Sequence, residues 1–427
     1  MPKLLVVLIA VPWLLAGCTA NPPAGRADRS GDTVVWINFD GLRWDYPDRV
    51  ETPAFDRLSR EGAVTRSLAP AFPSLTFPAH VSLATGVPVH EHGIAANAYY
   101  DRRTGEVLRF PPDAALLQAE PIWLSAERQD VRAAVFDWPV SHRQQGPVTA
   151  SRFNMGYEAR MPDEPRLFQP LEAWAEDHGA PPLRLLMGYA TATDSPGHAH
   201  GPDAPEMDAV IREADALLGR FVDRLTQLAD ERLRDGAQVY LVLTTDHGMS
   251  TVTHAVNAEL LLGLSRVEGV EVVTSGNIAN LYFTGASAEG HAATVRHVLD
   301  AAGAHDFASA WTRADLPARF GYANPHTVGD MVVVLGRGYI FSSRAEESVV
   351  PIQAVGGPLG MHGYDVESNP DMYGFSLVWR YPDPLPASDL GRVDYRRFHP
   401  TVARLLGIDP ASGATGEPLD LGLGAPE

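Results

Sequence analysis

The 427-residue chain is 45% apolar and 20% charged, a composition that excludes an intrinsically disordered protein. Its formal charge of −19 argues against a polynucleotide partner, because nucleic acids are bound largely through basic contacts to phosphate. Lys3 is the only lysine, which excludes both a P-loop lysine and a catalytic lysine Schiff base. A phosphate group must therefore be held by metal ions, arginine or the backbone.

The first residues predict a lipoprotein. Lys3 precedes an apolar run over 4–15 that is too short to span a bilayer and is typical of a signal-peptide core. The run leads into Leu-Ala-Gly-Cys at 15–18, which resembles a bacterial lipobox, where the chain is cut before a cysteine that then carries lipid. We expect a lipoprotein signal peptide over 1–17, lipidation at Cys18, a tether over 18–31 and a lipid anchor that holds the protein in the cell envelope, facing the periplasm or the exterior. A free or buried cysteine beside an ordinary cleavage site is the alternative.

The next segments predict alternating strands and helices. The apolar run Val34–Phe39 is typical of a buried strand, and it ends at Asp40 and Gly41. A short helix is expected from Pro53 to just before Gly62. A second helix is expected over 77–85, because Pro78 lies just inside its start and Gly86 just past its end.

Thr76 lies where a loop enters this second helix. A helix N-terminus has free N–H groups and the positive end of the helix dipole, so a hydroxyl there is well placed beside a bound phosphate. A purely structural role as the N-cap of the helix is the alternative, because threonine is a favoured cap.

The remaining segments predict a large core and an inserted lobe. Strands are expected over 131–136, 183–191 and 238–243 and a long helix over 205–229, whereas the Pro-rich region 139–182 shows no clear pattern. This alternation predicts an α/β fold with a mostly parallel central sheet that is flanked by helices on both faces, formed by 32–257 and 346–427. Three short strands over 270–274, 279–283 and 331–335 and a helix over 289–302 predict a small α+β lobe inserted at 258–345. The core resumes with a strand over 373–379 and a helix over 398–406.

Three aspartates follow apolar strands: Asp40, Asp194 and Asp246. Each alone is an ordinary turn residue. Ligands of parallel sheets lie beyond the carboxyl ends of the strands, and three carboxylates at one such edge would repel one another unless a cation lay among them. Histidine is the commonest zinc ligand, and three histidines lie in suitable places: His198, His247 and His362. No role is predicted for the other histidines, His142 among them.

Six ordered stretches together resemble the nucleotide pyrophosphatase/phosphodiesterase branch of the alkaline phosphatase superfamily. The matching stretches are 38–41, 73–80, 85–86 with 92–94, 194–198 with 201–202, 245–249 and 362–365. The resemblance implies an alkaline-phosphatase-like fold and two Zn²⁺ per chain. One zinc would be held by Asp194, His198 and His362. The second would be held by Asp40, Asp246, His247 and the Thr76 oxygen.

The resemblance also implies the roles of three residues in catalysis. Thr76 would be the nucleophile that becomes phosphorylated, Asn97 would donate to a phosphoryl oxygen, and Phe77 would pack on a base or another leaving-group moiety. We therefore expect hydrolysis of phosphodiester or pyrophosphate bonds in small, nucleotide-like phosphate esters. The alternatives are a phosphomonoesterase or a phospholipid or phosphonate hydrolase on the same scaffold, and a non-catalytic binding lipoprotein. A monoesterase needs a cation for the extra negative charge, and no arginine can be assigned to that role from the sequence.

Overall fold

The computed structural model describes residues 31–284 and 288–423. The expected signal peptide, the lipidation site Cys18 and nearly all of the expected tether lie outside these residues, so the lipid anchor stays a prediction. Within the described ranges, no helix is both long enough and apolar enough to cross a bilayer.

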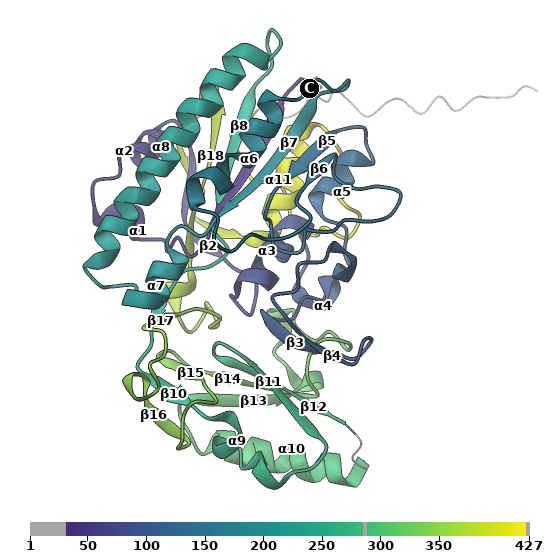
Figure 1. Cartoon of the computed structure of the whole chain (residues 1–427), viewed down its shortest axis with the longest axis vertical. Coiled ribbons are helices and arrows are strands. Elements are labelled where there is room, and N and C mark those ends of the chain that lie inside the picture. Colours follow the sequence, from purple (N-terminus) through teal and green to yellow (C-terminus); the bar gives the residue numbers. More distant parts are fainter. Residues whose placement is uncertain (1–30, 285–287, 424–427) are drawn as a thin grey trace, which may run out of the picture.

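The core is built on a nine-stranded sheet (Figure 1), whose order is β19-β2-β18-β8-β1-β7-β5-β6 with β20 beside β2. Its strands are β1 (Thr33–Phe39), β2 (Gly62–Ala69), β5 (Arg132–Val135), β6 (Arg152–Phe153), β7 (Leu183–Ala190), β8 (Val239–Thr244), β18 (Gly374–Tyr381), β19 (Ser388–Asp389) and β20 (Arg392–Asp394). Strand β18 is antiparallel to both of its neighbours, and the other pairings are parallel. The predicted mostly parallel sheet is confirmed.

Helices cover both faces of this sheet. One layer contains α1 (Tyr46–Arg49), α2 (Pro53–Arg60), α6 (Asp163–Ala175) and α8 (Glu206–Arg232), and the other contains α3 (Thr76–Thr85), α5 (Ile122–Glu127) and α11 (Phe398–Leu406). In β1, Val35 and Ile37 face the first layer, whereas Val34 and Trp36 face the second. A strand that is buried on both faces has no polar side, which is why this segment reads as a continuous apolar run.

Helix α6 lies inside the region 139–182, where the sequence showed no pattern. Pro170 stands in the interior of this helix, a position that normally breaks or kinks one. The helix packs on β7 at Gly188, where an added Cβ would lie 3.0 Å from Pro170 Cγ. Packing against the sheet thus supports a helix that local propensity would not predict.

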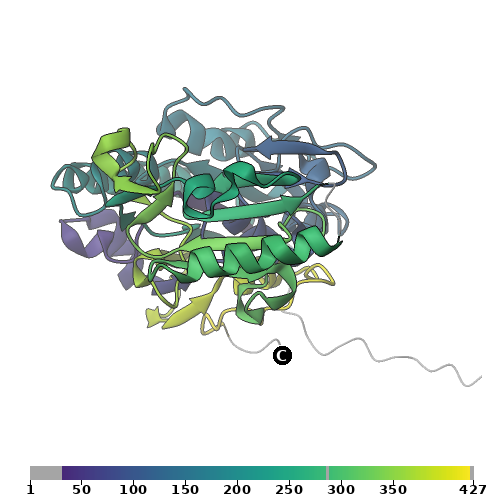
Figure 2. The same ribbon diagram turned by 90° about the horizontal axis from the view of Figure 1, so that it is seen from below.

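The small lobe contains a four-stranded sheet and one long helix. Its sheet has the order β11-β12-β14-β13, and Figure 2 shows α10 (Ala288–Gly303) lying along it. The strands are β11 (Val270–Ser275), β12 (Ile278–Phe283), β13 (Ala308–Thr312) and β14 (Met331–Leu335). Strand β13 was not predicted. In a separate three-stranded sheet, β10 (His254–Val256) is central and pairs with β15 (Tyr339–Phe341) and β16 (Val349–Pro351).

Short helices and strands lie within the loops at the carboxyl edge of the core sheet. These are α4 (Val89–His92), α7 (Asp194–His200), the hairpin β3 (Ala98–Asp101) and β4 (Glu106–Arg109), and the pair β9 (Ser250–Thr251) and β17 (Gly360–Met361). Helix α9 (Ala258–Leu261) packs in the lobe, beside α10 (Figure 1).

Candidate active site

The sheet brings the three strand-end aspartates together. Strand β1 lies between β7 and β8 and runs parallel to both, with Phe39 paired to Ala190 and Asn38 paired to Thr244. Asp40 follows β1 directly, Asp246 follows β8 by two residues, and Asp194 begins α7 after β7. The three carboxylates therefore converge at the carboxyl edge of the sheet, where α/β proteins bind ligands.

The three histidines share one arrangement: in each, Nδ1–H donates to a backbone carbonyl. The acceptors are Gly248 O for His247 at 2.9 Å, Gly360 O for His198 at 2.7 Å and Ser74 O for His362 at 2.9 Å. This bond fixes the tautomer and leaves the Nε2 lone pair free, as in histidines that bind metal ions.

The free nitrogens face the carboxylates at metal-ligand spacing. Asp194 Oδ1 lies 3.3 Å from His198 Nε2 and 3.5 Å from His362 Nε2. His247 Nε2 lies 3.3 Å from Asp40 Oδ1 and 3.0 Å from Asp246 Oδ2. Two ligands of a tetrahedral zinc ion, each with a bond of about 2.0–2.1 Å, lie roughly 3.3 Å apart. The spacing therefore fits the ligand shells of two adjacent ions.

One oxygen of each aspartate also lacks a hydrogen-bond partner among the described residues. Asp40 Oδ1, Asp194 Oδ1 and Asp246 Oδ2 are all buried in this state, which is costly unless a cation binds there. Two groups bring ligand atoms within 4.8 Å of one another, Asp40–Asp246–His247 and Asp194–His247–His362. His247 is in both groups, but its one free nitrogen is closest to Asp40 and Asp246, and His198 completes the other set.

Electrostatics at this cluster are unfavourable without a cation. Burial, and then the charges of Asp246 and Asp194, raise the pKa of Asp40 well above its ordinary value. Burial also acts to raise the pKa of Asp246, but the neighbouring His247 and His80 hold this pKa well below its ordinary value. A divalent ion bound among these carboxylates would offset the repulsion between their negative charges.

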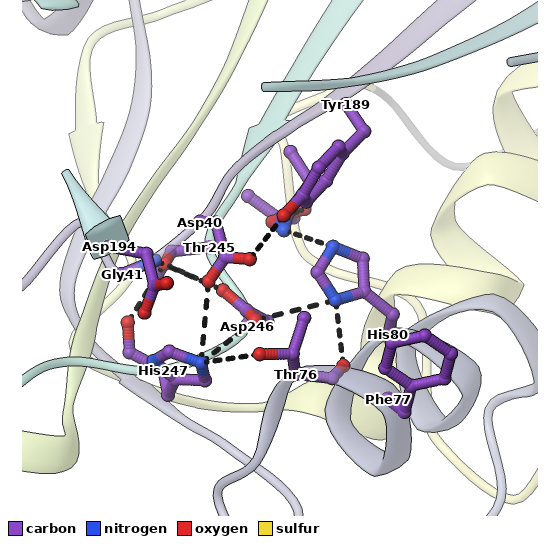
Figure 3. Close-up of polar contacts among 12 residues, drawn as sticks. Asp40, Gly41, Thr76, Phe77, His80, Tyr189, Asp194, Thr245, Asp246 and His247 are labelled. Atoms are coloured by element: carbon purple, nitrogen blue, oxygen red, sulfur yellow. Dashed lines mark hydrogen bonds and ion pairs between the residues drawn. The ribbon is translucent and has the colours of Figure 1, made fainter. Parts of the chain in front are cut away.

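Thr76 is the first residue of α3 and lies beside this cluster (Figure 3). Its Oγ1 is 3.3 Å from His247 Nε2. The N-cap of the helix is Leu75, and no side chain caps it, so the alternative of Thr76 as an N-cap is wrong. Gly86 ends the helix in a left-handed conformation with φ of 70°, as the sequence predicts.

Asn97 contacts the residue that follows the threonine. Asn97 Oδ1 accepts a hydrogen bond from the Phe77 backbone N–H at 3.0 Å, which leaves the Asn97 amide NH₂ as a donor. A cavity of about 330 Å³ opens beside Thr76, Phe77, Asp40 and Asp194. A larger cavity of about 510 Å³ lies between the lobe and the core and is lined by none of the predicted site residues.

Residues 34–365 match the family model for type I phosphodiesterase / nucleotide pyrophosphatase. The chain belongs to this family. The resemblance inferred from the six motifs is thus confirmed, and the protein is a phosphoric diester hydrolase or nucleotide pyrophosphatase.

Relatives match the chain along most of its length. Human ectonucleotide pyrophosphatase/phosphodiesterase family member 7 is 27% identical, over 95% of this chain and 86% of its own. Bovine bis(5'-adenosyl)-triphosphatase is 27% identical, over 96% of this chain and 84% of its own. The solved structure of an inactive variant of murine ectonucleotide pyrophosphatase/phosphodiesterase 5 in complex with AMP superposes with a TM-score of 0.76 at 23% identity, covering 91% of this chain and 97% of that one. This likeness confirms the predicted alkaline-phosphatase-like fold.

Two residues of the phosphodiesterase site were not predicted. His80 Nδ1–H donates to Thr76 O at 2.8 Å and lies 3.4 Å from Asp246 Oδ2. Tyr189 OH donates to Asp40 Oδ2 at 2.5 Å. His80 lies within a matching stretch, which is a signal that could have found it. Tyr189 lies in an apolar strand and offers no such signal.

Proposed function

We propose that this protein hydrolyses phosphodiester or pyrophosphate bonds of small nucleotide substrates through a covalent phosphothreonine at a two-zinc site. The observation that carries the proposal is the convergence of three histidine Nε2 atoms and three unpartnered carboxylate oxygens beside the Thr76 hydroxyl. The names of relatives that act on bis-adenosyl triphosphate or are seen with AMP support nucleotides as the substrate class.

The residues divide into two ligand sets in this proposal. Asp194, His198 and His362 would hold one zinc ion, and Asp40, Asp246, His247 and the Thr76 oxygen would hold the other. When bound there, zinc supplies Lewis acidity, which lowers the pKa of the threonine hydroxyl and neutralises charge on the phosphoryl group.

Thr76 Oγ attacks phosphorus in the first step, and the bond from phosphorus to the leaving oxygen breaks. The proton of the Thr76 hydroxyl passes to solvent, and Thr76 is left esterified to a phosphoryl group that still carries the other substituent of the substrate. Water then attacks the same phosphorus atom, releases the phosphate-bearing product and restores the hydroxyl. Asn97 donates its NH₂ group to a phosphoryl oxygen throughout, and the hydrogen bond to Phe77 N–H keeps the amide in this orientation.

Diester chemistry is favoured over monoester chemistry by the residues around the cavity. Among the described residues that line it there is no arginine or lysine to neutralise the second negative charge of a monoester.

Metal analysis combined with rates on bis(4-nitrophenyl) phosphate and 4-nitrophenyl phosphate tests the proposal. We expect two zinc ions per chain and at least a tenfold higher kcat/KM for the diester. A preference for the monoester, or no turnover by the zinc-loaded protein, would refute it.

Replacing Asn97 with alanine is expected to lower kcat/KM for diesters by about a hundredfold, because a donor aimed at developing charge is lost. Asn97→Asp is the matched control, since it keeps an oxygen to accept from Phe77 N–H but removes the NH₂ donor. Both variants should be impaired if donation matters. Full activity of Asn97→Asp in steady-state assays would show that Asn97 serves only to hold Phe77.

A further inference from the structure

Four aromatic side chains form part of the wall of the cavity beside Thr76. Phe77, Phe110, Tyr157 and Tyr189 all line it. The Phe77 and Phe110 rings meet edge to face with centroids 5.6 Å apart, and the Tyr157 and Tyr189 rings do so at 6.5 Å. A volume of about 330 Å³ with such walls suits a flat ring system.

His142, for which the sequence predicted no role, is one of the residues that line this cavity. Its side chain is 3% exposed, and its Nε2 lies 3.2 Å from Asp137 Oδ1. A carboxylate only accepts, so Nε2 carries the hydrogen and Nδ1 of the neutral ring is an acceptor. Nδ1 is buried, and no described residue donates to it. A buried acceptor without a partner is energetically costly, and because His142 lines the cavity, a ligand group that donates to Nδ1 would remove this cost.

Asp137 holds the imidazole in this orientation and is itself firmly fixed. Arg166 Nη1 donates to its Oδ2 at 2.6 Å, and Asn154 Nδ2 donates to its Oδ1 at 2.9 Å. Burial acts to raise the pKa of Asp137, but the hydrogen bonds from His142 and Asn154 and the charge of Arg166 hold it below its ordinary value. The group therefore stays a carboxylate and keeps the hydrogen on His142 Nε2.

The same arginine also holds one aromatic wall. The Arg166 guanidinium is fully buried and lies 4.4 Å from the centroid of the Tyr157 ring. The backbone nearby is strained, since Asp137 and Val140 have φ of 56° and 62°, and this conformation is rare for a β-branched residue. Such strain persists where surrounding contacts impose it, and it gathers at ligand sites.

We propose that His142 is a specificity-determining residue that accepts a hydrogen bond, through Nδ1, from the amino group of an amino-bearing nucleobase held in this aromatic cavity. Asp137 and Arg166 act as positioning residues that set its tautomer. The inference rests on the proposed function and adds to it a preference among nucleotides. An adenine amino group supplies the missing donor, whereas a purine without that group leaves Nδ1 unpaired.

The test compares ATP with purine riboside 5'-triphosphate, which differs only by the absence of the 6-amino group. The zinc-loaded enzyme converts each with one water to a nucleoside monophosphate and pyrophosphate, and both products are quantified by chromatography. We expect kcat/KM for ATP to be about tenfold higher, the size expected for one buried hydrogen bond. In His142→Phe the ratio should fall to about one, and in His178→Phe, an exposed histidine outside the cavity, it should keep the wild-type value.

The outcomes separate the inference from the function. Equal rates on the two triphosphates with the wild-type enzyme would overturn the inference and leave the function standing. Hydrolysis of neither, with bis(4-nitrophenyl) phosphate also intact, would overturn both. A preference for ATP that survives in His142→Phe would show that another group reads the base. Should His142→Phe fail to fold, the ratio measured with the wild-type enzyme alone decides. This comparison removes the amino group from the substrate and leaves the protein unchanged.

Discussion

Replacing Thr76 with alanine is expected to reduce kcat for phosphodiester hydrolysis by at least a thousandfold while leaving the protein folded. The variant lacks the oxygen that attacks phosphorus, and a loss of this size corresponds to about 4 kcal/mol or more of barrier. The fold should be unaffected, because the hydroxyl caps no helix and its one described polar contact is with His247 Nε2 at 3.3 Å. Steady-state rates and thermal melting of the same preparations check both halves of this expectation.

Thr76→Ser is the matched control for this variant. It retains a hydroxyl at the first position of α3 and should keep a measurable fraction of activity, with a phosphorylated serine detectable by mass spectrometry after rapid acid quenching. Thr76→Ala should show no phosphorylated residue. Substantial turnover by the alanine variant would contradict the covalent route and would favour direct attack of water.

Removing metal ions with a chelator is expected to abolish activity and to lower the melting temperature, and Zn²⁺ should restore both. Without a cation, Asp40, Asp194 and Asp246 keep buried oxygens with no hydrogen-bond partner among the described residues, and burial followed by the charges of the other two aspartates raises the pKa of Asp40. Ligand that binds only the folded state at about a thousand times its Kd stabilises it by roughly 4 kcal/mol. Histidine and carboxylate ligands bind zinc in their deprotonated forms, so zinc affinity should fall as pH is lowered.

Thr76→Ala protein separates the structural effect of the metal from catalysis. It keeps all six aspartate and histidine ligands, so its melting temperature should respond to chelator and zinc nearly as the wild type does although it is inactive. Calorimetric titration of the metal-free variant with zinc should show two sites. A melting temperature that is indifferent to both reagents in both proteins would contradict the metal centre.

Much of the fold could be predicted from local patterns, and the exceptions have physical reasons. Strand β1 and helix α11 were found nearly to the residue, because a continuous apolar run and a glycine stop are strong local signals. Helix α6 was missed because Pro170 argues against a helix, whereas in the structure the helix is buried against the sheet and Pro170 packs on Gly188 in β7. Strand β13 forms an edge of the lobe sheet, and its half-buried residues show little alternation.

The aspartate cluster and His142 show the same contrast within one site. Asp40, Asp194 and Asp246 could be predicted to lie together, because the carboxyl ends of parallel strands share one edge of the sheet. His142 could not be assigned a role, because the orientation of its ring depends on Asp137, which is in turn held by Arg166. Arg166 lies 29 residues beyond Asp137, in helix α6, which local patterns do not predict.

The amino-acid sequence by itself determined the order of the main strands and helices, the membership of the chain in its family and the residues that converge at the sheet edge, because each of these follows from local periodicity or contiguous motifs. Only the tertiary structure decided which imidazole nitrogens are free, where Tyr189 and His80 contact the cluster, and how Asp137 and Arg166 orient a histidine in the cavity. These features depend on contacts between side chains from distant segments, which form only when the sheet and its helices pack. Local sequence patterns do not predict such contacts.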